Sequence, residues 1–170
     1  IEQDATATEG AAYTPELATL NSQQIVVGKA AGTMFCKVSF TTPANIVFMA
    51  GWRTKEAHQA AFASYQGLAT VGTGAAGTAL STYGNLAAGT PVVTASGTNA
   101  LTTVINDFRV QVDMLGFVTA FINGVRYPIY SVGTTPLKFA TGTVLIPFMQ
   151  YTNLNSVAAV PTVTQFVGVP

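Results

Sequence analysis

Few side chains of this chain could take part in catalysis, and the sequence keeps them apart. The chain contains one histidine, His58, and one cysteine, Cys36. A serine or cysteine nucleophile needs a base such as histidine, which a further polar group orients. His58 lies in an alanine-rich stretch, and the nearest carboxylate, Glu56, is two positions away and points to a different side of a helix. The pattern therefore favours a surface or packing role for His58.

Carboxylates are equally sparse beyond the N-terminal region. After residue 16 the chain has three acids, Glu56, Asp107 and Asp113. Glycosidases use two carboxyl groups about 5 to 10 Å apart. Asp107 and Asp113 lie at the two ends of one expected strand, about 20 Å apart at about 3.3 Å per residue. We expect both to shape turns, and we expect the protein not to be an enzyme.

The sequence indicates no metal or cofactor site either. Zinc sites group histidines with cysteines and calcium sites group carboxylates, and neither grouping occurs here. Gly72, Gly74 and Gly77 form a glycine-rich stretch, but no lysine accompanies them as in a phosphate-binding loop. Arg53 and Lys55 are too small a basic cluster for nucleic acid. We expect no cofactor and no nucleic-acid partner.

Aromatic side chains leave one binding function open. Trp52, Tyr65, Tyr83 and Tyr127 are candidates for glycan contact, because their large amphipathic rings can lie against a sugar. The same residue types also fill cores and interfaces, and Trp52 ends an apolar run, which favours core packing. A lectin-like carbohydrate-binding module is therefore the alternative function for this chain.

Formal charge divides the chain into an acidic arm and a basic remainder. Four of the seven acids fall within the first sixteen positions: Glu2, Asp4, Glu9 and Glu16. All seven bases and the other three acids follow, so the arm carries −4 and the remainder carries +4. Opposite charges steer association, which predicts that the arm, residues 1–22, docks onto a partner. A solvated, frayed terminus is the other interpretation, and both stay open.

The composition indicates one domain whose surface is largely covered by neighbours. The chain of 170 residues is 49% hydrophobic and only 8% charged, whereas about a quarter of the residues in a soluble monomer are charged. We expect a single domain over residues 23–170, with Cys36 as a buried thiol. The longest strongly apolar run, 144–149, is far shorter than the roughly 20 residues of a membrane-spanning helix, so no membrane partner is expected.

Alternating and β-branched runs predict an all-β fold. Strands are expected over 24–28, 33–41, 45–52, 107–113, 117–122, 125–127, 137–141, 143–151 and 157–169. The apolar face of the second strand consists of Met34, Cys36, Val38 and Phe40. Asn123-Gly124 suits a two-residue hairpin turn, so the strands after residue 107 form a meander that ends at Pro128. Residues 67–100, rich in Gly, Ala and Thr, predict short strands and long loops.

One stretch, residues 54–65, is predicted to be helical. Thr54 suits an N-cap, and three alanines share one side with Tyr65 at helical spacing. The sequence therefore predicts an antiparallel sandwich of about ten strands with one short helical insertion and an extended N-terminal arm.

Parts of the sequence resemble known families. Residues 107–125, which read DFRVQVD, a short turn, and then GFVTAFINGV, are similar to the strand pair of concanavalin-like jelly rolls. Segments 48–65, 69–72 and 144–148 resemble virion structural proteins of tailed phages, and the likeness extends over roughly residues 30 to 168. Sugar-hydrolysing members of the jelly-roll family carry an acidic catalytic strand motif, which this chain lacks.

The resemblance implies a concanavalin-like jelly roll and a non-enzymatic virion structural protein. The chain is small for a tailed-phage shell subunit, so the implied role is capsid decoration or cement, stabilising the shell through the arm and the sheet surfaces. The expected partners are the capsid protein and copies of the same chain, in a small symmetric oligomer that we expect to be a trimer. The expected location is the virion surface, after assembly in the host cytoplasm. In the lectin-like alternative, the module belongs to a head or tail fibre.

Overall fold

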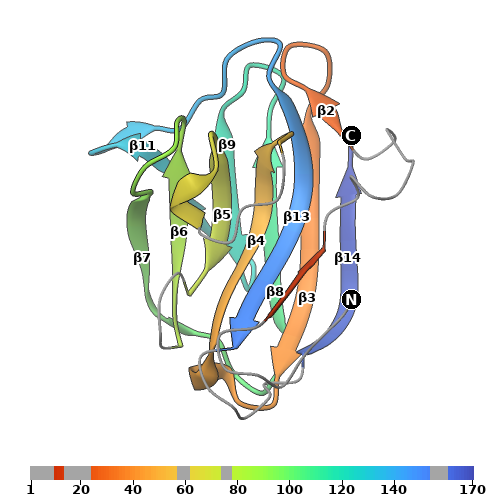
Figure 1. Ribbon diagram of the computed structural model, residues 1–170, viewed down its shortest axis with the longest axis vertical. Helices are drawn as coiled ribbons and strands as arrows, with labels where there is room; N and C mark the ends of the chain where they lie inside the picture. The colour runs from red at the N-terminus through yellow and green to blue at the C-terminus, as the bar shows by residue number, and fades with distance from the viewer. Residues whose placement is uncertain (1–9, 14–23, 57–61, 74–77, 154–160) are drawn as a thin grey trace.

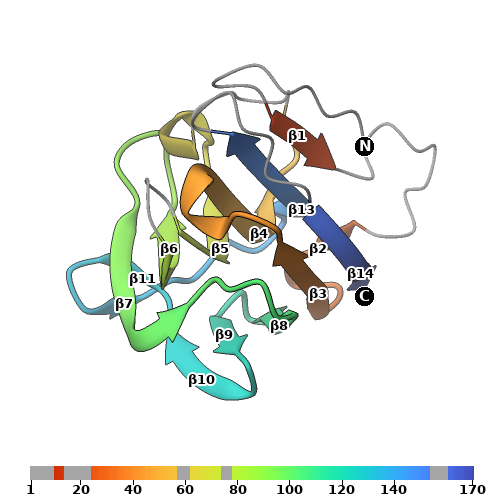
Figure 2. The ribbon, with the colours of Figure 1, turned by 90° about the horizontal axis from the view of Figure 1, so that it is seen from below.

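The computed structural model describes residues 10–13, 24–56, 62–73, 78–153 and 161–170. They form two antiparallel sheets packed face to face (Figures 1 and 2). The seven-stranded sheet has the order β1 (Gly10–Tyr13), β13 (Val144–Asn153), β4 (Ile46–Thr54), β5 (Leu68–Gly72), β6 (Ala79–Asn85) and β7 (Val92–Ala100), and β2 (Ile25–Val26) also pairs with β13. The five-stranded sheet has the order β10 (Val125–Pro128), β9 (Val118–Ile122), β8 (Asn106–Val112), β3 (Gly32–Phe40) and β14 (Pro161–Val169). The predicted all-β sandwich is confirmed.

Short elements complete the described part of the chain. β11 (Tyr130–Val132) and β12 (Thr135–Pro136) form a small hairpin, and η2 (Pro43–Asn45) and η3 (Phe62–Ser64) are 3₁₀ turns. Among the described residues, no helix has the length and apolar character needed to cross a bilayer.

The core lies between the sheets and consists of alternate, inward-facing residues. On β3 the buried side chains are Met34, Cys36, Val38 and Phe40, as predicted. Trp52 is fully buried, and its indole Nε1 donates to Val110 O on the facing sheet at 2.9 Å. Burial, reinforced by the charge of Asp107, raises the pKa of the Cys36 thiol. Core packing of Trp52 and the buried thiol are thereby confirmed.

The predicted meander is confirmed as β8, β9 and β10. Asn123 and Gly124 have φ angles of 49° and 81°, which is the left-handed conformation that a two-residue hairpin turn requires. The last pair of β10 joins Pro128 to Thr119. The strand ends there, because a proline offers no N–H to continue a ladder.

The helix predicted over 54–65 is wrong in its described part. Thr54 is the last residue of β4, where it pairs with Leu145, and its N–H donates to Gly67 O at 3.0 Å. β4 lies between β13 and β5, and both neighbours satisfy its backbone groups, so the strand continues through the expected helix cap. Residues 62–64 form the 3₁₀ turn η3, and residues 57–61 lie outside the described residues.

The strand predicted over 137–141 is also wrong. Its backbone donors bind two different segments, because Leu137 N donates to Ile129 O at 2.8 Å and Phe139 N donates to Gly116 O at 3.0 Å. A strand needs one partner along its length, and this segment instead fastens the β12–β13 connection to its neighbours.

In the region 67–100 the structure is more regular than predicted. The expected long loops are replaced by β5, β6 and β7, which pair in sequence order as antiparallel neighbours. Small residues give little hydrophobic periodicity, so the extent of these strands depends on their neighbours in the sheet.

Candidate functional site

Burial removes most of the predicted glycan-contact aromatics from solvent. Trp52 and Tyr65 are fully buried, and Tyr83 is nearly so. Tyr127 is half-buried, and its hydroxyl donates to Ser96 O at 3.1 Å. The first three cannot offer a ring face to a ligand from solvent, because the fold uses them for packing. The candidate acids Glu2, Asp4, Glu9 and Glu16, together with His58, lie outside the described residues.

The first notable surface is the outer face of the seven-stranded sheet, which we call the closed face. Alternate residues of β4 and β13 that point away from the core form a second buried cluster with Tyr65. Its members are Met49, Tyr65, Leu68, Tyr83 and Phe148. The rings of Tyr65 and Phe148 lie 5.7 Å apart between centroids. Tyr65, from the segment that follows β4, therefore packs back onto the part of this face that β4 and β13 form.

A buried arginine lies at the centre of the closed face. Arg53 is fully buried, and its Cζ lies 4.9 Å from the Tyr65 ring centroid and 5.8 Å from that of Phe148. Its Nη1 donates to Thr54 O at 3.1 Å and to Glu56 O at 2.9 Å. Carbonyl acceptors and ring faces compensate the desolvation of the guanidinium. Arg53 therefore holds the chain after β4 against the sheet.

Two further contacts of the closed face are polar. The Tyr65 hydroxyl donates to Gln150 Oε1 at 3.3 Å. Burial raises the pKa of Tyr83 above its ordinary value, and a weaker hydrogen bond with Ser81 acts in the opposite direction. The raised pKa keeps Tyr83 neutral near neutral pH, which suits packing rather than proton transfer.

The carboxylates of the described residues have structural partners. The Glu56 carboxylate accepts from Thr54 Oγ1 at 2.6 Å and from Gln66 N at 2.8 Å, so it shapes the segment after β4. Asp107 faces Lys37 at 4.0 Å. Among the residues that the structure describes, no three His, Cys, Asp or Glu side chains are close enough to hold a metal ion.

Asp113 has the turn-forming role that the sequence predicts. Its Oδ1 accepts hydrogen bonds from the backbone N–H groups of Leu115 and Phe117, both at 2.9 Å. These two bonds fix the connection between β8 and β9, which is the function of an aspartate in a turn.

The outer face of the five-stranded sheet, the open face, is built differently. Register places Phe35, Arg109, Phe121 and Arg126 in one row across β3, β8, β9 and β10. The Arg109 Cζ lies 3.9 Å from the Phe121 ring centroid. A shallow groove of about 180 Å³ follows this row. Aromatic and cationic groups alternate along this row, and the Asp107 carboxylate also lines the groove.

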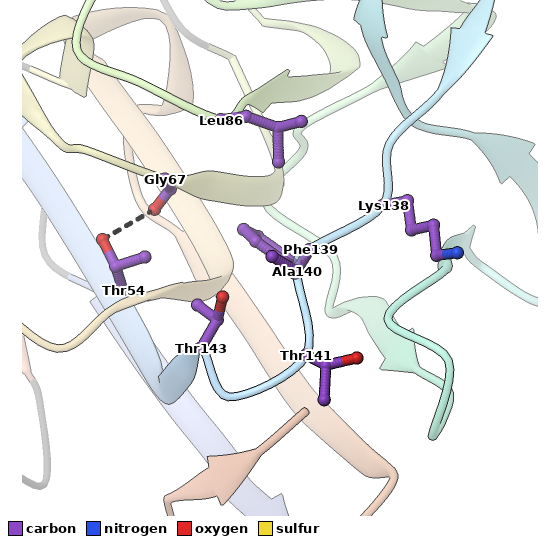
Figure 3. Close-up of a pocket in the computed structure, with 8 residues that line it drawn as sticks. All are labelled: Thr54, Gly67, Leu86, Lys138, Phe139, Ala140, Thr141 and Thr143. Carbon is purple, nitrogen blue, oxygen red and sulfur yellow. Dashed lines mark hydrogen bonds between the residues drawn. The ribbon is translucent and has the colours of Figure 1, made fainter. Parts of the chain in front are cut away.

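The larger cavity, which we call the loop pocket, lies at the end of the seven-stranded sheet (Figure 3). Its volume is about 340 Å³, within the size range of small-ligand sites. The lining residues are Thr54, Gly67, Leu86, Lys138, Phe139, Ala140, Thr141 and Thr143. They come from the ends of β4, β5 and β6 and from the connection into β13.

Hydroxyl groups and one ring give the loop pocket its character. Figure 3 shows Thr54, Thr143 and Leu86 around the buried Phe139, with the Lys138 side chain directed away. The Lys138 ammonium lies 4.8 Å from the ring centroid of Phe117, and Phe117 is not one of the residues that line the pocket. Among the described residues, the lining set contains no carboxylate, and the nearest acid is Glu56, which is hydrogen-bonded to the lining Thr54. The hydroxyl groups suit a neutral polar ligand.

Comparison with known proteins gives the fold. No family model and no curated protein matches the chain. The carbohydrate recognition domain of Emp47p is similar in structure, with a TM-score of 0.62 and 12% identity over 97% of this chain and 80% of that one. The potassium-bound carbohydrate recognition domain of Emp46p has a TM-score of 0.61 and 8% identity, over 97% of this chain and 80% of that one. Alginate lyase PA1167 from Pseudomonas aeruginosa has a TM-score of 0.56 and 9% identity, over 84% of this chain and 65% of that one.

The fold is a concanavalin-like jelly roll. This confirms the predicted fold class. The fold resembles that of carbohydrate-recognition domains, although fold likeness alone does not assign a function.

Sequence reasoning did not find the loop pocket. Its hydroxyl-bearing residues, Thr54, Thr141 and Thr143, are separated by more than eighty positions at their extremes. Threonine is common throughout the chain, so no local pattern marks these three. The sequence predicted a strand over 137–141, so the pocket-forming connection was not recognised as a loop, although loops placed on a rigid sandwich often bind ligands.

Proposed function

We propose that this protein is a non-catalytic carbohydrate-binding domain whose ligand occupies the loop pocket. The observation that carries the proposal is a pocket of about 340 Å³ with threonine hydroxyls around a buried ring. The likeness to the Emp47p and Emp46p carbohydrate recognition domains supports it at the level of the fold.

The chemistry of the pocket favours a neutral sugar unit. Thr141 and Thr143 supply hydroxyls that can donate and accept, whereas the Thr54 hydroxyl already donates to Glu56. Leu86, which is 48% exposed, supplies apolar surface for the C–H face of a ring, and the buried Phe139 forms part of the pocket wall behind it. With no lining carboxylate, the pocket binds its ligand and leaves it unchanged.

Blocking the pocket tests this function. Ala140 is exposed and lines the pocket, so Ala140→Trp should fill the cavity without disturbing the core. Ala44 is also exposed, but it lies in η2, at the other end of β4 from the pocket. Ala44→Trp is therefore the matched control.

The measurement is a glycan array, followed by calorimetry of the best ligand. We expect millimolar to micromolar binding by the native chain and by Ala44→Trp, and at least about tenfold weaker binding by Ala140→Trp. If no glycan binds at millimolar concentration, or if both tryptophan variants bind equally well, the loop pocket is not a glycan site.

A second proposed function is a structural component of a tailed-phage virion, decorating or cementing the capsid. It is favoured by the sparse charge of the chain, 8% of residues, and by large apolar side chains on the described surface, of which Val132 is 73% exposed. Surfaces of this kind are usually covered by a partner. In this proposal the acidic arm docks onto the shell.

The virion proposal is tested on particles. Electron microscopy of intact particles should locate the protein on the shell, and deletion of residues 1–20 should reduce its occupancy strongly. Full occupancy by the deleted chain would remove the docking role of the arm, and absence of the protein from particles would remove the proposal itself.

A further inference from the structure

Three segments that are distant in sequence are fastened together at one end of the sandwich. They are the turn 27–30, the loop 113–117 and the connection 137–143. The turn 27–30 and the connection 137–143 lie side by side at the top of Figure 1. Gly28 N donates to Met114 O at 3.0 Å, Gly142 N donates to Val27 O at 2.8 Å, and Phe139 N donates to Gly116 O at 3.0 Å.

Backbone conformation fixes these segments further. Each contains one glycine with a φ near +90°: Gly28 at 90°, Gly116 at 91° and Gly142 at 89°. Other residues rarely adopt this conformation, so each turn is set by its sequence as well as by its hydrogen bonds. The end is therefore a preformed surface.

This surface, the platform, exposes apolar side chains next to lysines. Met114 is 54% exposed, Leu115 is 66% exposed and Phe117 is 41% exposed. Lys29 and Lys138 are exposed beside them, with the Lys138 ammonium over the Phe117 ring. Exposed apolar groups on a rigid surface usually mark a contact site, and the lysines favour a partner that carries acids.

The opposite end of the sandwich, the far end, also exposes apolar residues. Val104 is 71% exposed, Ile105 is 50% exposed and Val125 is 53% exposed. Asn106 Nδ2 donates to Val104 O at 3.0 Å, and Asn123 Nδ2 donates to Asn106 Oδ1 at 3.3 Å. Side-chain hydrogen bonds thus hold the far end, as backbone bonds hold the platform.

The first described residue of the N-terminal region, Gly10, lies toward the far end. Gly10 of β1 pairs with Thr152, near the end of β13 that is remote from the platform. The preceding residues 1–9 contain Glu2, Asp4 and Glu9. To reach the platform of its own copy, an acid of this segment would have to run along most of β13, about 26 Å at about 3.3 Å per residue. Glu9 adjoins Gly10, and Asp4 is six residues from it, a span of about 20 Å when fully extended. Neither can reach that platform, so the arm of a second copy fits better.

We propose that copies of this chain associate head to tail, with the platform of one copy against the far end and the acidic residues 1–9 of the next. Apolar side chains meet apolar side chains, and Lys29 and Lys138 meet Glu2, Asp4 and Glu9. The two patches differ, so the contact is heterologous, and it closes into a ring or continues as a filament.

Sedimentation velocity of the full chain over a range of concentrations tests the proposal. The native chain should associate at low ionic strength, and about 0.5 M salt should weaken the association by screening. Leu115→Asp places a charge on the platform and should weaken association at least about tenfold. Val132→Asp is the matched control, since Val132 is still more exposed, at 73%, but belongs to neither end.

A charge exchange identifies which surfaces meet. A chain with Lys29→Glu and Lys138→Glu should fail to associate with itself, and so should a chain with Glu2→Lys, Asp4→Lys and Glu9→Lys. A mixture of the two should associate, because each platform then faces an arm of opposite charge. Failure of the mixture, or association of either variant alone at the native level, would overturn the proposal.

Two other outcomes would also overturn the proposal. A native chain that stays monomeric at low salt has no such contact. Binding of the platform to anionic phospholipid vesicles, without self-association, would identify a membrane as its occupant. Glycan binding is measured separately on Leu115→Asp, because Leu115 does not line the loop pocket; this variant should lose self-association and keep glycan binding.

Discussion

Two arginines show how the same contact has different consequences on the two sheets. Arg53 lies over the Tyr65 ring on the closed face, and Arg109 lies over the Phe121 ring on the open face. Arg53 is fully buried and donates to two backbone carbonyls. Arg109 is only half-buried and keeps contact with solvent.

The difference teaches that burial, and not the pair of residue types, decides what a cation–ring contact does. On the closed face water is excluded, so the contact and its hydrogen bonds are strong and their loss leaves desolvated groups without partners. On the open face water competes for the guanidinium, so the contact contributes little to stability and stays available for a ligand.

The largest expected effect comes from removing one ring from each face. Phe148→Ala should lower the free energy of unfolding by about 3 to 5 kcal/mol, because a fully buried side chain is lost and the Arg53 contact with it. Phe121→Ala, on the half-buried side, should cost about 1 kcal/mol. Urea denaturation measures both, and equal losses would break the distinction between the faces.

Replacing each arginine by methionine tests the same distinction with smaller changes. Arg53→Met should cost about 2 to 4 kcal/mol, because the carbonyls of Thr54 and Glu56 lose their donor. Arg109→Met should change stability by less than about 1 kcal/mol. The measurement is the midpoint of denaturant unfolding, compared between variants whose unfolding curves have the same slope. A larger loss of stability for Arg109→Met than for Arg53→Met would mean that Arg109 anchors the open face.

The smallest expected effect is a pH dependence of the closed face. Burial raises the pKa of Tyr83 above its ordinary value of 10.0. The stabilising contribution of neutral Tyr83 is therefore complete below about pH 10 and is lost as the pH rises through its folded-state pKa. Tyr83→Phe should reduce the fall in denaturant midpoint between about pH 8 and about pH 11, and an unchanged fall would show that Tyr83 ionises with the same pKa in the folded and the unfolded chain.

Local patterns predicted much of the sandwich. The alternation of Met34, Cys36 and Val38 gave the buried face of β3, and Asn123-Gly124 gave the turn between β9 and β10. Both depend on residues within a few positions of each other, which makes them visible in one sequence. The helix expected after Thr54 failed because the backbone partners of that residue, Leu145 and Gly67, come from strands elsewhere in the chain.

The candidate surfaces were much harder to predict than the strands. Arg53 was noted only as a base beside Lys55, and its burial depends on Tyr65 and Phe148, twelve and ninety-five positions away. The platform likewise depends on Gly28, Gly116 and Gly142, whose turns meet only in the folded chain. Nothing local distinguishes these residues from others of their types.

The sequence by itself determined the class of the fold and the distribution of charge. Period-two alternation predicts strands, strands with one apolar face predict packed sheets, and the placement of the acids and bases along the chain is read directly. Tertiary structure decided which surfaces are accessible: it buried Trp52 and Tyr65, closed one sheet face around Arg53, and brought three loops together at one end. The physical reason is range, since alternation and turns act between near neighbours, whereas desolvation depends on every segment that packs against a residue.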